Sequence, residues 1–446
     1  MSGLVRFVTE RTPKGWTTKP LWALFRREKL TGFPNEELLS VYRDYGVIPK
    51  SSRDDNHNKE SEDLGGYQLV SEGSLVTNKM KAWQGSIAIS RHRGIVSPAY
   101  YVYRPLSNEH DQFLHYLLRS DPYIALYRRI SKGVRVNQWD LEHEALRTIP
   151  VMLPDRDTQR AIAEFLDCET ARIDELIDRK QNMARCLSER FDNLVRKGVT
   201  SGVSRHNTKY SDSGIDYIGH TPTHWSVEKT GWRYEIQLGK MLDSSKQTGQ
   251  FSKPYLRVAD VQWDEILTAD LPSMDFGIAD RQRYRLRLGD LIVNEGGSYV
   301  GRSAIWQDQI EECYYQKALH RLRPRNPHRD TSEYFLWVMW FATKHGIFVA
   351  NGNQTTIDHL TAEALYRFRF VFPPINEQFE ISSFLAEERN KTRSTTQKIN
   401  ASVQRLGEYR AALITAAVTG QIDTTEYARK GDTDRRLDAI EAEMRA

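Results

Sequence analysis

Apolar side chains recur at every seventh position in two separate stretches of the chain. The first stretch has this spacing at Leu166, Ile173, Lys180, Leu187 and Leu194. The second keeps it at Leu385, Ile399, Leu406 and Leu413, while Thr392, Thr395, Thr396 and Ser402 enter its apolar stripe. A period of seven is typical of helices that pair along one stripe, so the pattern predicts two long coiled-coil helices.

The two predicted helices differ in how apolar the flanks of their stripes are. In the first, the adjacent positions are Leu176, Ile177, Met183, Ala184 and Phe191, all of which we expect to be buried. The threonine-rich second helix is the weaker one alone, and we expect it to need the first as a partner. Asp157 and Asn376 are the predicted N-caps, and Gly198, Gly202 and Gly420 mark the predicted C-terminal ends.

The two stretches are copies of one segment. Residues 154–203 match residues 373–422 without a gap at an offset of 219, and Pro154, Gln159 and Ile162 recur as Pro373, Gln378 and Ile381. The duplication divides the chain into residues 1–153, 154–203, 204–372, 373–422 and a charged tail at 423–446. About 45 residues in each helix give a length of roughly 65 Å. We expect the two helices to pack antiparallel. The alternative is that each packs only on its own domain.

The segments before each helix are related more loosely. Residues 12–16 resemble 221–225, and residues 73–78 resemble 289–294, with offsets of 209 and 216. Strands are predicted at 86–90, 100–103 and 290–293, and helices near 109–130 and 330–348. The expected fold class is therefore two copies of an α/β (α+β) globular recognition domain, separated by two long antiparallel coiled-coil helices in a pseudo-two-fold symmetric arrangement.

Composition limits the class of protein. Hydrophobic residues make up 39% of the 446 positions, enough for real cores, and the longest apolar run, at 334–342, is too short to cross a bilayer. With no signal-peptide pattern at the start, we expect a cytoplasmic protein without a membrane segment. The three cysteines show no metal-ligand spacing, so neither a disulfide framework nor a metal site is expected.

Positive charge is concentrated in the first domain. Residues 1–154 hold 22 Lys and Arg against 17 Asp and Glu, whereas residues 204–372 hold 21 against 20. Such an excess is compatible with a nucleic-acid partner, although a basic face is often only a solvated one. A phosphate-binding loop, a dinucleotide motif and a nuclease-like carboxylate cluster are all missing, so the sequence predicts no catalytic role and no cofactor.

Residues 159–167, which read Gln-Arg-Ala-Ile-Ala-Glu-Phe-Leu-Asp, carry a resemblance to a known family. Together with 169–174, with Val-Thr-Ser-Gly at 199–202 and with the duplication, they resemble the specificity subunit of type I restriction-modification enzymes. The run at 390–396 departs from that pattern. The resemblance implies two target recognition domains, each reading half of a bipartite asymmetric DNA sequence. It implies helices that set the gap and dock two modification (methyltransferase) subunits, and it allows restriction (motor-nuclease) subunits to join.

Candidate base-reading residues follow from this resemblance and from the side chains that hydrogen-bond to base edges. In the first domain they are Lys79, Lys81, Trp83, Gln84, Arg91, His92, Arg93, Arg135, Asn137 and Gln138. In the second they are Tyr299, Arg302, Asn351, Asn353 and Gln354. Arg281, Arg283, Arg285 and Arg287 alternate as one face of a strand would. For each, surface solubility is the alternative, and for Trp83 core packing.

Two other functions stay open at this point. One is a coiled-coil interaction scaffold that binds no DNA, and the other is a fused subunit in which one domain is a degenerate methyltransferase or nuclease. The target bases and the gap length depend on loop geometry that residue identity does not fix.

Overall fold

The computed structural model describes residues 12–43, 45–53, 61, 63–135, 138–203, 208–241, 249–297, 300–348 and 359–445. The chain forms two compact units. The first combines Met1–Asn182 with Lys398–Ala446, and the second is the continuous stretch Met183–Gln397. Both long helices are therefore divided between the units, so that each unit holds one domain and half of each helix.

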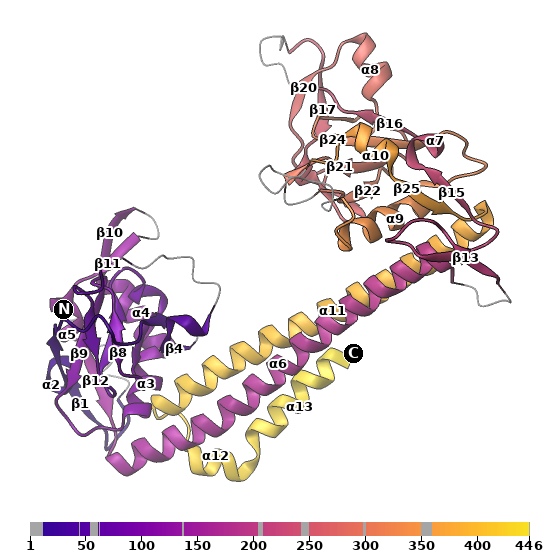
Figure 1. Ribbon diagram of the computed structural model, residues 1–446. Coiled ribbons are helices and arrows are strands. Elements are labelled where there is room, and N and C mark those ends of the chain that lie inside the picture. Colours follow the sequence, from indigo (N-terminus) through magenta and orange to yellow (C-terminus); the bar gives the residue numbers. More distant parts are fainter. Residues whose placement is uncertain are drawn as a thin grey trace. The chain divides into compact units, whose positions relative to one another are not determined.

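The first domain is built on a four-stranded antiparallel sheet in the order β2-β9-β6-β7. Figure 1 labels β9 of this sheet. Its strands are β2 (Phe25–Glu28), β6 (Leu75–Asn78), β7 (Ile87–Ile89) and β9 (Tyr100–Pro105). Three pairs flank it: β1 (Thr17–Pro20) with β12 (Pro150–Leu153), β3 (Leu39–Tyr42) with β4 (Gly46–Pro49), and β5 (Gln68–Val70) with β8 (Gly94–Val96). The predicted strands at 86–90 and 100–103 are confirmed.

Helices cover this sheet and complete the core of the first domain. They are α2 (Leu21–Leu24), α3 (Asp111–Arg119), α4 (Asp121–Ile130), α5 (His143–Arg147) and the short 3-10 turns η1 (Lys50–Ser52) and η2 (Ala82–Gln84). The single helix predicted near 109–130 is two, because Ser120 takes an extended conformation between α3 and α4. A separate hairpin pairs β10 (Ser131–Arg135) with β11 (Gln138–Leu141).

The second domain repeats the same framework. Its sheet runs in the order β16-β24-β21-β22, with β16 (Tyr234–Leu238), β21 (Leu291–Asn294), β22 (Ser303–Ile305) and β24 (Leu319–Pro324). The pair β15 (Ser226–Lys229) and β25 (Arg369–Phe372) matches β1 and β12, while α7 (Thr230–Arg233), α9 (Ser332–Lys344) and α10 (Ala362–Arg367) match α2, α3 and α5. Phe25 faces Pro105 in one sheet, and Tyr234 faces Pro324 in the other. The two halves therefore share both topology and register.

The segments between these shared elements make the second domain different. They contain β13 (Tyr210–Asp212) with β14 (His220–Pro222), β17 (Ser252–Leu256) with β20 (Ser273–Asp275) and β23 (Tyr314–Tyr315), β18 (Val261–Gln262) with β19 (Glu265–Ile266), η4 (Val258–Asp260) and α8 (Ile278–Tyr284). The basic strand predicted from Arg281 to Arg287 is wrong. Arg281 and Arg283 lie in α8, whose first turn begins where the Arg281 N–H donates to the Gly277 carbonyl at 2.9 Å.

The duplicated segments form the long helices α6 (Arg156–Ser201) and α11 (Ile375–Val418). The predicted N-caps are each wrong by two residues. Asp155 caps α6, since its carboxylate accepts from the Thr158 N–H at 3.0 Å, and Asn376 lies inside the first turn of α11. Gly202 and Gly420 end the helices with φ of 84° and 65°, a conformation in which glycine has no steric penalty.

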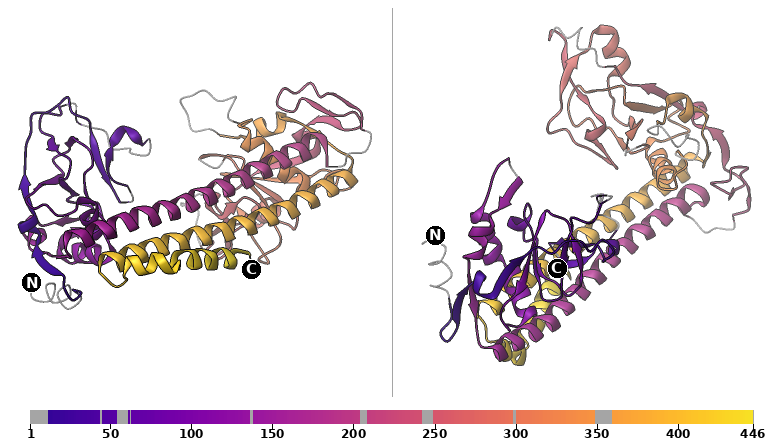
Figure 2. Two further views of the ribbon diagram at one scale, coloured as in Figure 1. Left: turned by 90° about the horizontal axis from the view of Figure 1, so that it is seen from below. Right: turned by 60° about the vertical axis from the view of Figure 1, so that its left-hand side comes forward.

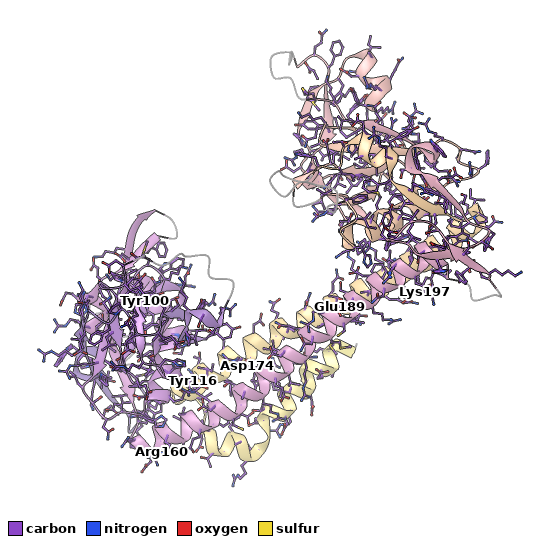
Figure 3. The ribbon with its side chains drawn as sticks, viewed as in Figure 1. Tyr100, Tyr116, Arg160, Asp174, Glu189 and Lys197 are labelled. Carbon is purple, nitrogen blue, oxygen red and sulfur yellow. The ribbon has the colours of Figure 1, made fainter. Side chains whose placement is uncertain are left out.

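Within each unit the two helix halves pack against each other and run in opposite directions (Figure 2). In the first unit Arg410 on α11 pairs with Asp174 on α6 at 2.8 Å, and Figure 3 labels Asp174 along that helix. In the second, Gly198 lies against Leu385 while Arg190 reaches Glu388. The predicted antiparallel coiled coil is confirmed. The alternative also holds in part, because each helix end joins a domain core.

Burial along the heptad stripe is uneven. Leu166, Ile173, Leu385, Ile399, Leu406 and Leu413 are buried. Leu187 and Leu194 are only half-buried, and Met183, predicted to fill the stripe, is exposed. The second half of α6 therefore has less apolar contact along this row than the seven-residue repeat indicates.

The charged tail folds into two further helices, α12 (Thr424–Lys430) and α13 (Asp432–Arg445), which belong to the first unit. Leu437 and Ile440 of α13 join the same core as Leu406 and Leu413. Lys180, the polar residue of the first heptad row, pairs with Glu441 and lies 3.3 Å from the Met444 sulfur. Its position in the stripe is explained by this third helix.

A buried glutamine fixes the start of each long helix. Gln159 accepts from the His110 N–H at 2.9 Å and donates to the Pro154 carbonyl at 3.0 Å. Gln378 accepts from the Thr331 N–H at 3.0 Å and donates to the Pro373 carbonyl at 2.9 Å. Both side chains thus join the proline turn before the helix to the start of α3 or α9. This contact accounts for the glutamine in both copies.

Candidate nucleic-acid interface

In the first domain, the candidate residues between β6 and β7 surround the short turn η2. Lys79 donates to the Pro98 carbonyl at 2.8 Å, and its Nζ lies 4.8 Å above the Tyr101 ring. Lys81 is exposed, and Gln84 is half-buried with its backbone N–H bonded to the Lys81 carbonyl. Two cationic side chains and an amide are thus presented at one end of the β6–β7 hairpin.

The β10–β11 hairpin lies beside this turn. Trp139 of β11 packs on Trp83 with ring centroids 5.0 Å apart, and the Leu141 N–H donates to the Lys79 carbonyl at 3.0 Å. Trp83 also donates from Nε1 to the Met80 carbonyl, so it is held at a partly exposed site and is not part of the domain core. The hairpin has Arg135 opposite Gln138. Asn137 falls outside the described residues.

Arg91, His92 and Arg93 do not join this group. They follow β7, whereas η2 precedes it, so the antiparallel β6–β7 pair places them at the opposite end of the hairpin. Arg93 pairs with Glu36 at 2.8 Å, Arg91 lies 4.0 Å from Asp167 on α6, and the His92 N–H donates to Ser90. The structure therefore divides the candidates of the first domain into two sets.

Sequence reasoning missed Arg27 and Tyr101. The Arg27 guanidinium lies 4.6 Å from the centroid of Tyr101, whose ring is also contacted by Lys79. Burial lowers the pKa of Lys79, and the positive charge of Arg27 lowers it further. The available signal was the basic run Arg26-Arg27-Glu28-Lys29, which lies partly in β2. Arg27 therefore adds a positive charge to the surface beside η2.

In the second domain, Arg302 occupies the position that corresponds to the end of the η2 turn. It precedes β22 and donates from Nη1 to the Gln262 side chain at 2.6 Å. Gly301 before it has φ of 78°, and a β-carbon there would overlap Thr343 and Phe348. Glycine is therefore required to let the chain pass so close to α9. Tyr299, Asn351, Asn353 and Gln354 lie outside the described residues.

The partner of Arg302 belongs to a hairpin that α11 holds in place. Arg389 pairs with Asp264 at 3.2 Å, donates to the Trp263 carbonyl at 2.6 Å and lies 4.6 Å from the centroid of Trp340. Arg393 pairs with Glu265 at 3.1 Å. Burial lowers the pKa of Arg389 and raises that of Asp264, so each charge depends on the other. We call this set of contacts the Arg389 clamp.

In the part of the chain that the structure describes, no group of His, Cys, Asp and Glu residues is placed to hold a metal ion. No helix within the same residues is long and apolar enough to cross a membrane.

The chain has two α/β domains of one topology, and each is followed by one helix of an antiparallel pair. Each domain carries a different polar loop at the same end of its sheet. These features define a class of two-domain recognition subunits. The family model for the type I restriction modification DNA specificity domain matches residues 13–183 and 234–405. The chain belongs to this family, and its role is that of a DNA-recognition subunit.

One curated relative and two solved structures are similar to this chain over most of its length. The specificity subunit of the type I restriction enzyme EcoKI from Escherichia coli (strain K12) is 18% identical over 443 residues, covering 95% of this chain and 92% of that one. A solved structure that describes complex assembly and conformational transition of the type I R-M system aligns with a TM-score of 0.69 at 16% identity, over 92% of this chain and 99% of that one. The HsdS subunit from Thermoanaerobacter tengcongensis aligns with a TM-score of 0.48 at 15% identity, over 92% and 98%.

Proposed function

We propose that each domain reads one half of a bipartite asymmetric DNA sequence and that α6 and α11 fix the gap between the halves. The observation that carries this proposal is the repeated framework with unlike loops. The η2 turn and the β10–β11 hairpin mark the first domain, and Arg302 with the β18–β19 hairpin marks the second. One scaffold with two different loop sets suits two different half-sites, because base edges are read by the side chains that reach them.

The subunit itself performs no chemistry in this proposal. It is a cytoplasmic chain that brings two modification (methyltransferase) subunits to duplex DNA, with room for restriction subunits in the same complex. The exposed faces of α6 and α11 dock the modification subunits, since both helices leave most of their outward positions solvent-accessible. The lysines and arginines beside η2 contact phosphates, which makes binding salt-dependent.

Mapping of methylated bases tests the proposal. The complex is produced in a host that lacks other methylation, and modified bases are located across the genome with and without this subunit. We expect one asymmetric motif of two specified parts with a constant unspecified gap. A continuous palindrome, or modification that does not depend on this subunit, would contradict the proposal.

A loop replacement assigns each half-site to its domain. Replacing residues 79–86 should change the bases specified in one half of the motif and leave the other half and the gap unchanged. The matched control is a replacement of residues 90–93, which lie at the other end of the same hairpin. Changes in both half-sites after the first replacement would show that the domains do not read independently.

A further inference from the structure

A hollow of about 400 Å³ opens on the first domain beside β2 and α5. Among its lining residues are Trp22, Arg26, Arg27, His143 and Arg147. Trp22 follows the start of α2 and is 52% exposed, an unusual position for a large aromatic side chain. The hollow therefore combines an accessible aromatic face with three guanidinium groups.

The wall of the hollow is fixed on one side and open on the other. His143 is hydrogen-bonded through Nδ1 to the Tyr103 hydroxyl at 2.9 Å, and burial lowers the pKa of its ring, with Arg27 adding to the effect. Arg147 pairs with Glu144 at 3.0 Å. Arg26 is exposed, and no side-chain partner is found for it within the described part of the chain. The cationic groups thus exceed the acidic ones that reach them.

The second domain offers an internal comparison at matching positions of the same framework. The shared register aligns Arg26 with Glu235 and Arg27 with Ile236, and the matched α5 and α10 helices align Arg147 with Tyr366. Gly231 stands where the first domain has Trp22, and the Tyr366 ring packs so closely on it that a β-carbon would overlap the ring. Three positive charges in one domain are therefore replaced by one negative charge, an isoleucine and a tyrosine in the other.

This asymmetry argues against a structural need for the charges. The same framework closes around Tyr366 and Gly231 in the second domain, so neither the sheet nor α5 requires arginines at these places. A cationic hollow with an exposed indole is instead suited to a phosphate group whose attached sugar or base lies on the aromatic face, because guanidinium groups form forked hydrogen bonds to phosphate oxygens.

We propose that this hollow binds a phosphate ester, and that in the working complex the ester is a backbone phosphate of the DNA flanking the first half-site. The proposal rests on the proposed function. Arg27 connects the hollow with the surface beside η2, because it lines the hollow and also contacts the Tyr101 ring beside Lys79. DNA at the η2 turn would therefore meet a row of cations that leads to the hollow, and the second domain has no cation at the positions that match Arg26, Arg27 and Arg147.

Salt-dependent binding tests the proposal. The complex with its modification subunits is titrated with a duplex that extends well beyond both half-sites, for the wild type and for Arg26→Ala/Arg147→Ala. Each lost phosphate contact should lower the slope of log Kd against log salt by about 0.9, so we expect a reduction of about 1.8. Lys14→Ala/Lys209→Ala, which removes two exposed positive charges elsewhere, is the matched control and should leave the slope within error.

Duplex length distinguishes the two sources of phosphate. With a duplex cut at the outer edge of the first half-site, the difference between wild type and double variant should vanish, and trimming the other end should not affect it. A mononucleotide is the second probe: a fluorescence change present in the wild type and absent in Trp22→Phe, without any effect of duplex length, would assign the hollow to a free phosphate ester. An unchanged slope together with no Trp22 signal would overturn the proposal.

Failure of this inference is separable from failure of the proposed function. The variant Trp22→Gly/Arg26→Glu/Arg147→Tyr leaves Arg27 in place and transfers residues that the second domain already accommodates at matching positions, so it should fold. Its methylation map should keep the same bipartite motif while its affinity for the long duplex falls. If the wild type showed no bipartite methylation motif, the proposed function would be refuted. If the variant kept the motif and bound the long duplex with unchanged affinity, only the phosphate site would be refuted.

Discussion

At the scale of single residues, Gln159 and Gln378 show how a buried polar side chain can be retained in both copies for a structural reason. Each has no exposed surface. Each pairs with a backbone N–H at the start of α3 or α9 and with the backbone carbonyl of the proline before the long helix. The side chain acts as the joint between a domain and its helix.

Replacing either glutamine with leucine should therefore destabilise its own unit. Gln159→Leu leaves the His110 N–H and the Pro154 carbonyl buried without partners, at a cost of about 2 kcal/mol in the free energy of unfolding. Gln378→Leu should do the same for the second unit. Urea denaturation measures both, and Gln404→Leu, at an exposed position of α11, is the control. Equal losses for all three variants would show that the joint has no special role.

We expect His115 to make the first unit less stable in acid. Burial, with the charge of nearby Arg119 as the next cause, lowers the pKa of His115 from 6.5 to about 3. Between these values the unfolded chain binds a proton that the folded chain does not, so stability falls as the pH falls through this window. Because the side chain is partly exposed, we expect a loss of only ~1 kcal/mol between pH 6.5 and 5.

His115→Gln should lose less stability than the wild type over the same pH range. The measurement is the denaturation midpoint at pH 8, 6.5 and 5, and the comparison at pH 8 separates the effect of the substitution itself from that of the proton. If the two proteins lost stability in parallel below pH 6.5, protonation of His115 would not be the cause.

The sequence predicts buried heptad leucines better than it predicts interface contacts, and the reason is physical. Leu166, Leu406 and Leu413 are buried because spacing along one helix already determines which face they share. Arg27, Tyr101 and Lys79 meet only because three strands from distant parts of the chain pair in a particular register. The spacing of residues along the sequence does not predict which side chains come into contact when distant strands pair.

At the scale of elements, the arginine-rich stretch at 281–287 shows how a two-residue alternation can mislead. Arginine and glutamine are good helix formers, and the Gly277 N–H donates to Asp280 at the start of α8. Local capping therefore determines the outcome there. Lys180 shows the converse, since its place in an apolar row makes sense only with α13, whose packing on α6 the charged tail sequence does not reveal.

The Arg389 clamp joins a long helix to a recognition loop. Arg389 holds the β18–β19 hairpin, and Gln262 of that hairpin accepts from Arg302. Arg389→Ala removes the ion-pair partner of Asp264, whose side chain is 37% exposed, together with the guanidinium that packs on Trp340. It should lower the free energy of unfolding of the second unit by about 1.5 kcal/mol. It should also relax base preference in one half-site only.

Arg389→Lys and Arg393→Ala separate the two effects. The lysine keeps the charge beside Asp264 but loses the forked donor, so stability should recover in part while base preference stays relaxed. Arg393→Ala removes an exposed ion pair and should cost less than 1 kcal/mol. Methylation of single-base variants of the motif measures preference, and loss of preference in both half-sites would argue for general unfolding.

At the scale of the whole molecule, the proposed gap depends on the length of both long helices together. Inserting one heptad after Ser188 of α6 and one after Thr395 of α11 keeps the apolar stripe continuous and adds roughly 10 Å to each helix. We expect the methylated motif to keep both half-sites and to gain up to about three base pairs of gap, from the spacing of about 3.4 Å per base pair.

The contrasting variants carry the insertion in one helix only. A single insertion moves Leu385 or Leu187 out of register with the opposite helix and should reduce modification at every motif. Recovery of the original gap by the double insertion would mean that the helices do not set it. Altered half-site bases would mean that helix length and base reading are not independent.

The first unit contains the end of α11 together with α12 and α13, so the two units can complete their folding only in a fixed order during synthesis. The second unit is one continuous stretch, Met183–Gln397, and it can finish folding as soon as it leaves the ribosome. The first unit lacks Leu406, Leu413, Leu437 and Ile440 until these residues are made, after the whole of the second unit. The domain that is translated first is thus the last to be completed. A chain that stops before Lys398 leaves its N-terminal half with an open core and exposed to proteases.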